Sequence, residues 1–148
     1  MSLSDIKTPN RPATKPDALE GAEKVLHVSF ELRGETLQAS VSCKILDLDE
    51  SLSRDRALVR LAAPEKYDDL PQMSKLRIYA LAHLAHALID PPQWLNKWVT
   101  KYDPLLFSLY EEVSAHEQAY FRADLLSSQE DPQRQPVVKV RSLDAPAP

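Results

Sequence analysis

Apolar and polar residues alternate along residues 24–45, with one interruption at 33–36. Successive side chains of an extended strand point to opposite faces, so a period of two predicts strands. Gly34 lies in the interruption and can take the positive φ that a tight connection needs. We therefore predict a β-hairpin over 24–45. Its expected inward face holds Leu26, Val28, Phe30, Leu32, Leu37, Ala39, Val41, Cys43 and Ile45.

After residue 46 the apolar period lengthens to about 3.6 residues, which is typical of helices packed on one side. Asp49 or Ser51 is the expected cap of the first helix, whose inward residues are Leu52, Leu58, Val59 and Leu61. Within residues 21–126 the motif Asp-Pro occurs at 90–91 and again at 103–104, and each of these copies predicts a capped helix start. The predicted helices span 50–62, 74–89, 92–102 and 104–126.

The chain holds 12 prolines and only 2 glycines among its 148 residues. Seven of the prolines fall in residues 1–20 and 127–148, which contain few large apolar residues and are expected to form disordered arms. Residues 136–141 carry a β-branched run that could add as an edge strand to a sheet or to a partner. The fold class is thus predicted as a helix-dominant α+β domain over 21–126, with a hairpin followed by four helices.

Composition excludes several classes of function. Two glycines are too few for a Gly-rich phosphate-binding loop, and a net charge of −4 argues against a nucleic-acid coat. The single cysteine cannot form an internal disulfide. Because the sequence has neither an apolar run of about 18 residues nor a signal-peptide pattern, we expect no membrane association and no secretion.

Four side chains invite a metal-binding hypothesis: His83, His86, Glu112 and His116. The first two are three residues apart on one predicted helix, and the last two are four apart on another. Against this, neither His83 nor His86 has a glutamate three residues before it, and Tyr120 stands where a zinc motif beginning at His116 needs its second histidine. A metal-binding helical protein therefore stays a second alternative, and no cofactor is expected.

Other reactive residues give no catalytic set. Cys43 is in the inward register of the hairpin, where a free thiol behaves as a small apolar side chain. Glu111, Glu112 and Glu117 have polar neighbours on a predicted helix, which is typical of a solvated face. We therefore predict that the protein is not an enzyme.

Five aromatic residues are the candidates for partner binding. Trp94, Trp98 and Tyr102 share one stripe of the third predicted helix, and Tyr120 and Phe121 widen the apolar arc of the last. Aromatic residues at helical spacing also commonly belong to a core, so both interpretations stay open.

The order of these elements and their sequences resembles the tail assembly chaperones of long-tailed bacteriophages over about residues 24–126. The segments that carry the resemblance are DRALVRLA at 55–62, IDPPQWL at 89–95, PLL at 104–106 and LYEEV at 109–113.

The resemblance implies a small, mainly helical, non-enzymatic protein that acts in the host cell cytoplasm. Such proteins coat the aggregation-prone tape measure protein and help recruit the tail tube protein. Together with the apolar helix edges, the resemblance suggests that a partner helix binds in a groove. The long proline-rich arms depart from the compact members of the family and leave open a minor structural role in the virion, in the phage tail or baseplate. A homo-oligomer is compatible with either role.

Overall fold

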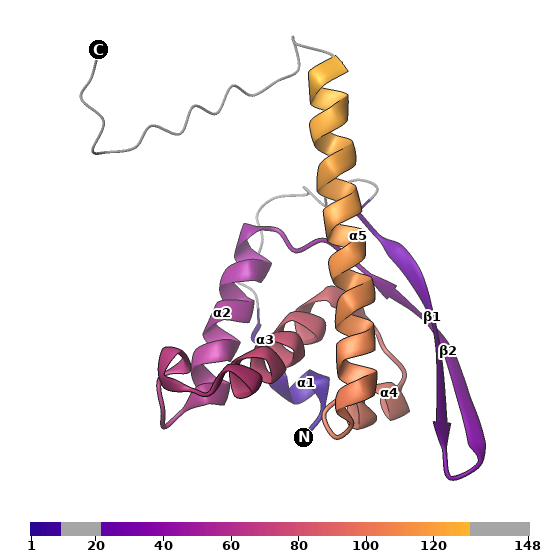
Figure 1. Cartoon of the computed structure of the whole chain (residues 1–148), viewed down its shortest axis with the longest axis vertical. Coiled ribbons are helices and arrows are strands. Elements are labelled where there is room, and N and C mark those ends of the chain that lie inside the picture. Colours follow the sequence, from indigo (N-terminus) through magenta and orange to yellow (C-terminus); the bar gives the residue numbers. More distant parts are fainter. Residues whose placement is uncertain (10–21, 131–148) are drawn as a thin grey trace.

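The computed structural model describes residues 1–9 and 22–130, without the side chains of residues 124 and 127–130 (Figure 1). The fold class is α+β with helix dominant, as predicted. In chain order the elements are α1 (Leu3–Ile6), β1 (Lys24–Leu32), β2 (Glu35–Cys43), α2 (Leu48–Ala62), a 3-10 turn (Tyr67–Asp69), α3 (Gln72–Ala87), β3 (Leu88–Ile89), α4 (Gln93–Trp98) and α5 (Asp103–Glu130).

The predicted hairpin is present, and its register follows from its turn. Arg33 and Gly34 alone connect the strands, with φ values of 52° and 80°. Two positive φ values are typical of the two-residue turns that match the twist of a hairpin. The resulting pairs place Leu26 opposite Val41, so that alternate apolar residues of both strands share the inner face.

A third strand, β3, pairs antiparallel with the end of β2, and the sheet order is β1-β2-β3. The sequence predicted that Leu88 and Ile89 end a helix, which is wrong. Leu88 instead pairs with Cys43, and the Lys44 amide donates to the Ala87 carbonyl. Pairing with a distant strand thus ends α3 at a point where the apolar helical pattern continues.

The core centres on α3, which packs against α1, α2 and α5. Figure 1 shows α3 crossing between α2 and α5, with α1 close to it. Every residue from Ala80 to Leu88 is buried. The second half of this helix is therefore buried around its whole circumference, as expected of a central element.

The predicted inward face of the first long helix is wrong. Of the four residues named, only Leu58 is buried, whereas Leu52 and Val59 are 46% and 70% exposed. These residues do not fall on one side of a 3.6-residue helix. Apart from Leu58, the actual inward stripe is made by smaller or polar residues, namely Glu50, Ser53, Ala57 and Ala62.

Two of the predicted caps are also wrong. The side chain of Asp47, not of Asp49 or Ser51, accepts from the Glu50 amide at 2.8 Å and caps α2. Asp90 has a φ of 45° and does not cap a helix, because α4 begins only after Pro92.

The chain ends differ from the predicted arms. Residues 3–6 form α1, where Leu3 and Ile6 are buried, so the prediction of a flexible arm over 1–20 is wrong for residues 1–9. Helix α5 continues to Glu130, past the predicted end at residue 126 and into the predicted tail over 127–148. Residues 10–20 of the N-terminal arm, residues 131–148 of the C-terminal arm and the predicted edge strand at 136–141 lie outside the described residues.

None of the helices in residues 1–9 and 22–130 combines the length and the apolar character needed to cross a membrane.

Candidate functional site

Helix α5 has an anchored half and a projecting half. Its first part is held in the core by Leu105, Leu106, Leu109 and Val113, all of them buried. Its last turns extend beyond the other helices in Figure 1. A helix that leaves its domain in this way exposes side chains that no other described element covers.

The projecting half carries exposed apolar residues. Phe121, Leu125 and Leu126 are 50%, 64% and 55% exposed, and Tyr120 packs edge-on against Phe121 with ring centroids 5.4 Å apart. Phe121 and Leu125 are four residues apart, so they occupy one face of the helix. We call Tyr120, Phe121, Leu125 and Leu126 the distal apolar patch.

The other predicted aromatic residues gather at the opposite end of α5, around Phe30 of β1. The ring of Phe30 lies parallel to that of Trp94, with an interplanar angle of 5° and centroids 6.4 Å apart. Trp98 and Tyr102 lie at 6.2 Å and 5.4 Å from the same ring. These aromatics thus fasten α4 and the start of α5 to the hairpin.

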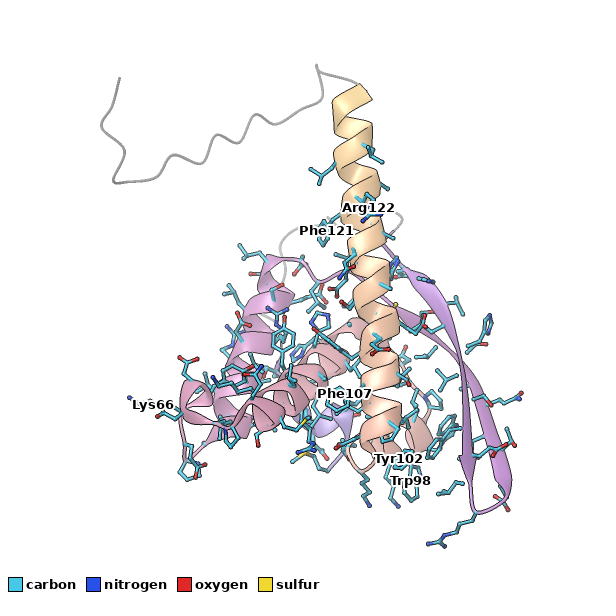
Figure 2. The ribbon with its side chains drawn as sticks, viewed as in Figure 1. Lys66, Trp98, Tyr102, Phe107, Phe121 and Arg122 are labelled. Atoms are coloured by element: carbon cyan, nitrogen blue, oxygen red, sulfur yellow. The ribbon has the colours of Figure 1, made fainter. Side chains whose placement is uncertain are left out.

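The five predicted partner-binding residues therefore do not form one groove in the described part of the chain. Phe121 follows Asp103 by 18 residues, which corresponds to about 27 Å along a helix. Figure 2 shows Trp98 and Tyr102 near the start of α5 and Phe121 with Arg122 toward its other end. Helical spacing identified both groups of aromatic residues. It could not show that Trp94, Trp98 and Tyr102 pack against Phe30.

The structure does not bring together the four side chains of the metal-binding alternative, because each has its own surroundings. His83 contacts Arg54 and Glu117, and the Nε2 atom of His116 lies 2.7 Å from the Ala22 carbonyl oxygen. Glu112 is exposed. Among residues 1–9 and 22–130, no group of three or more histidine, cysteine, aspartate or glutamate side chains could hold a metal ion.

His86, the fourth member of that set, has its own buried partners. Nε2 accepts the Thr8 amide at 3.0 Å, and Nδ1 lies 2.7 Å from the Ala82 carbonyl oxygen. Because a carbonyl only accepts, Nδ1 carries the proton and the ring is neutral. Burial lowers the pKa of His86, which agrees with this neutral form.

Cys43 is buried in the core, as predicted. Burial raises the pKa of its thiol, so the reactive thiolate is disfavoured. This cysteine therefore contributes packing to the sheet.

The structure also has a cleft that the sequence pattern did not predict. It lies between β1 and α5, has a volume of about 420 Å³ and is lined in part by Glu111 and Glu112. The cleft borders the edge of β1 that does not pair with β2. Which strand lies at the edge of the sheet depends on where β3 pairs, and the apolar pattern did not predict β3. The remaining residues that line the cleft are Leu26, His27, Val28, Ser29, Phe30, Tyr102, Pro104, Leu105, Ser108 and Leu109.

Two surfaces thus present themselves for binding, namely the distal apolar patch and the β1–α5 cleft. Comparisons with protein-family models, with curated proteins and with solved structures found no match. Both candidate surfaces are accordingly defined by their geometry alone.

Proposed function

We propose that this protein is a non-enzymatic phage tail assembly chaperone that binds a helical segment of the tape measure protein in the host cell cytoplasm. The observation that carries the proposal is the distal apolar patch on the projecting half of α5. The resemblance in sequence pattern supplies the class of partner.

The chemistry of the patch favours a helical partner. Phe121 and Leu125 form a short apolar ridge, and such ridges pack into the grooves between side chains of a second helix. Fully burying one such side chain contributes about 1.5–3 kcal/mol. A few apolar residues therefore support binding that is specific yet reversible, which suits a chaperone that must release its client.

This mode differs from the groove expected from the sequence. Trp94, Trp98 and Tyr102 pack on Phe30, and we assign them to holding α4 and α5 against the hairpin. Tyr120 and Phe121 remain as the partner-binding aromatics. The client helix then lies alongside α5, which projects far enough from the core to be approached from the side.

Co-expression with a tape measure protein tests the proposal. Phe121→Gln combined with Leu125→Gln should greatly reduce the soluble fraction of the client, because the apolar ridge is lost while helix propensity is kept. Met73→Gln with Leu76→Gln is the matched control, since these residues are 55% and 46% exposed on α3, away from the patch. This control pair should keep the client as soluble as the unaltered protein does.

A client that is equally soluble with and without this protein would overturn the chaperone function. Equal loss of the client with both double variants would overturn the role of the distal apolar patch. Mass spectrometry of purified particles separates the chaperone from a structural component, because a chaperone should be absent from them.

A further inference from the structure

Among residues 1–9 and 22–130, no strand pairs with the second edge of β1, and this edge faces the β1–α5 cleft. The sheet order places β2 on only one side of β1. Five consecutive residues, 26–30, line the cleft, and no residue of β2 does. Because alternate residues of a strand point to opposite faces, five in a row can line one cleft only if the backbone edge is presented.

The hairpin register indicates which backbone groups point into the cleft. In a two-residue hairpin the residues that flank the turn, here Leu32 and Glu35, form a hydrogen-bonded pair, and such pairs alternate along the strands. His27, Ser29 and Glu31 are then in the non-hydrogen-bonded positions, with amide and carbonyl groups directed away from β2. An added strand could form backbone hydrogen bonds with these amide and carbonyl groups.

The side chains around this edge favour a particular kind of strand. Leu26, Val28, Leu105 and Leu109 give the cleft an apolar floor. Among the described residues that line it, Glu111 and Glu112 are the only acids, both are exposed, and none is a lysine or arginine. A β-branched segment that carries cations and no acid would match both features.

One segment of this chain has that composition. Residues 137–141 read Val-Val-Lys-Val-Arg, with three β-branched residues and two cations. We propose that residues 137–141 of a second copy of this chain add to β1 as a further strand in the β1–α5 cleft. Backbone hydrogen bonds supply the attachment, and Lys139 and Arg141 lie near the glutamates.

The geometry of α5 points to a second copy instead of the same chain. Glu112, at the near end of the cleft, precedes Glu130 by 18 residues, or about 27 Å of helix. Residues 131–137 span at most about 25 Å when fully extended. Val137 of the same chain therefore falls short of the near end of its own cleft. Since each copy has one cleft and one tail, mutual exchange closes a two-fold dimer.

The full-length chain provides the first test. Light scattering coupled to size exclusion should show a dimer at micromolar concentration. Lys139→Glu with Arg141→Glu should weaken the dimer at least about tenfold, and Glu111→Lys with Glu112→Lys should do the same. The protein carrying all four changes should recover most of the affinity. A monomeric full-length chain, or a four-fold variant no tighter than either double variant, would overturn the proposal.

A second variant tests the strand edge itself. Ser29→Pro removes an amide that points into the cleft and leaves the β1–β2 hydrogen bonds in place, so it should abolish the dimer. Ser29→Thr is the matched control and should dimerise normally. Circular dichroism identifies a Ser29→Pro protein that fails to fold, in which case the charge exchange alone decides. A folded Ser29→Pro protein that still dimerises would overturn the assignment to β1.

The inference does not rest on the proposed function, since the cleft and the distal apolar patch are different surfaces. Loss of the dimer in the charge variants, with solubilisation of the tape measure protein unchanged, would separate the two.

Discussion

A guanidinium nitrogen of Arg54 lies 3.2 Å from Nδ1 of His83, across the contact between α2 and α3. Arginine offers only donors, so Nδ1 accepts and the neutral ring carries its proton on Nε2. Nε2 in turn donates to the carboxylate of Glu117 on α5. The ring is 4% exposed and stacks on Tyr79, with centroids 5.8 Å apart. One imidazole therefore joins the three long helices.

This arrangement predicts a large effect of removing the acceptor. In Glu117→Met a side chain of similar length replaces the carboxylate, and the buried Nε2–H of His83 loses its partner. An unsatisfied buried donor costs about 1–3 kcal/mol, so the free energy of unfolding should fall by that amount. Urea unfolding of the variant near neutral pH measures it.

Glu117→Gln is the control, because its amide oxygen can still accept from His83. Its loss of stability should be clearly smaller than that of the methionine variant. Equal losses would show that packing around Glu117, and not the hydrogen bond to His83, holds α5 in place.

His86 predicts a pH dependence of stability. Burial lowers its pKa in the folded state, so the unfolded chain binds a proton more readily, with a pKa of about 6.5. This contribution to stability is complete above that value and is lost as the pH falls below it. The protonated ring also could not accept the Thr8 amide, so acid should loosen the N-terminal segment.

Urea unfolding between neutral pH and about pH 5 tests this direction. One such group changes stability by at most about 1.4 kcal/mol per pH unit. His86→Gln keeps an acceptor and a donor but does not titrate, so its stability should fall less steeply over the same range. A slope identical to that of the unaltered protein would contradict the role given to His86.

Replacing Phe30 should change both the stability of the protein and the fluorescence of its two tryptophans. Phe30→Ala opens a space beside Trp94 and Trp98 and should cost about 3–5 kcal/mol, the range for large core aromatics. Both rings should become more exposed, and their fluorescence should shift to longer wavelength. Val25→Ala on the same strand, 53% exposed, should change neither quantity. An unshifted emission in Phe30→Ala would show that the tryptophans are held elsewhere.

The pattern of apolar and polar residues predicted those parts of the fold that depend on residues close together in the sequence. Alternation at Leu26, Val28 and Phe30 marks a half-buried strand, and a connection that contains Gly34 limits the strand pairing to a few registers. In the first half of α5, the buried residues Leu105, Leu106, Leu109 and Val113 follow the helical period that the sequence shows. Most of the domain was therefore predictable as a hairpin followed by helices.

Long-range contacts decided the rest. Leu88 and Ile89 suit a helix or a strand, and only the free edge of β2 selects the strand. The buried face of α2 carries Glu50 and Ser53, which satisfy local partners and therefore tolerate burial. For the candidate surfaces, spacing identified Trp98 and Phe121 equally well, but only the packing shows that one is covered by Phe30 and the other is exposed.

The N-terminal segment supplies the sharpest contrast between composition and packing. Leu3 and Ile6 are 2% and 1% exposed, and α1 packs on α3 and α4. The segment is further held by Arg60, which donates to the Ile6 carbonyl. With only two large apolar residues among polar neighbours, this segment has the composition of a flexible arm. The two residues nevertheless lie one turn apart on the face of α1 that packs against the domain.

Ile6→Ala should therefore destabilise the whole domain, by about 2–4 kcal/mol, since deleting buried methyl and methylene groups leaves a cavity against α3. Lys7→Ala, at the exposed neighbouring position, should stay within about 0.5 kcal/mol of the unaltered protein. Thermal or urea unfolding of the two variants gives a direct comparison. If the segment were a flexible arm, both substitutions would be neutral. An unchanged unfolding midpoint for Ile6→Ala would therefore show that residues 1–9 belong to the disordered arm that composition alone predicts.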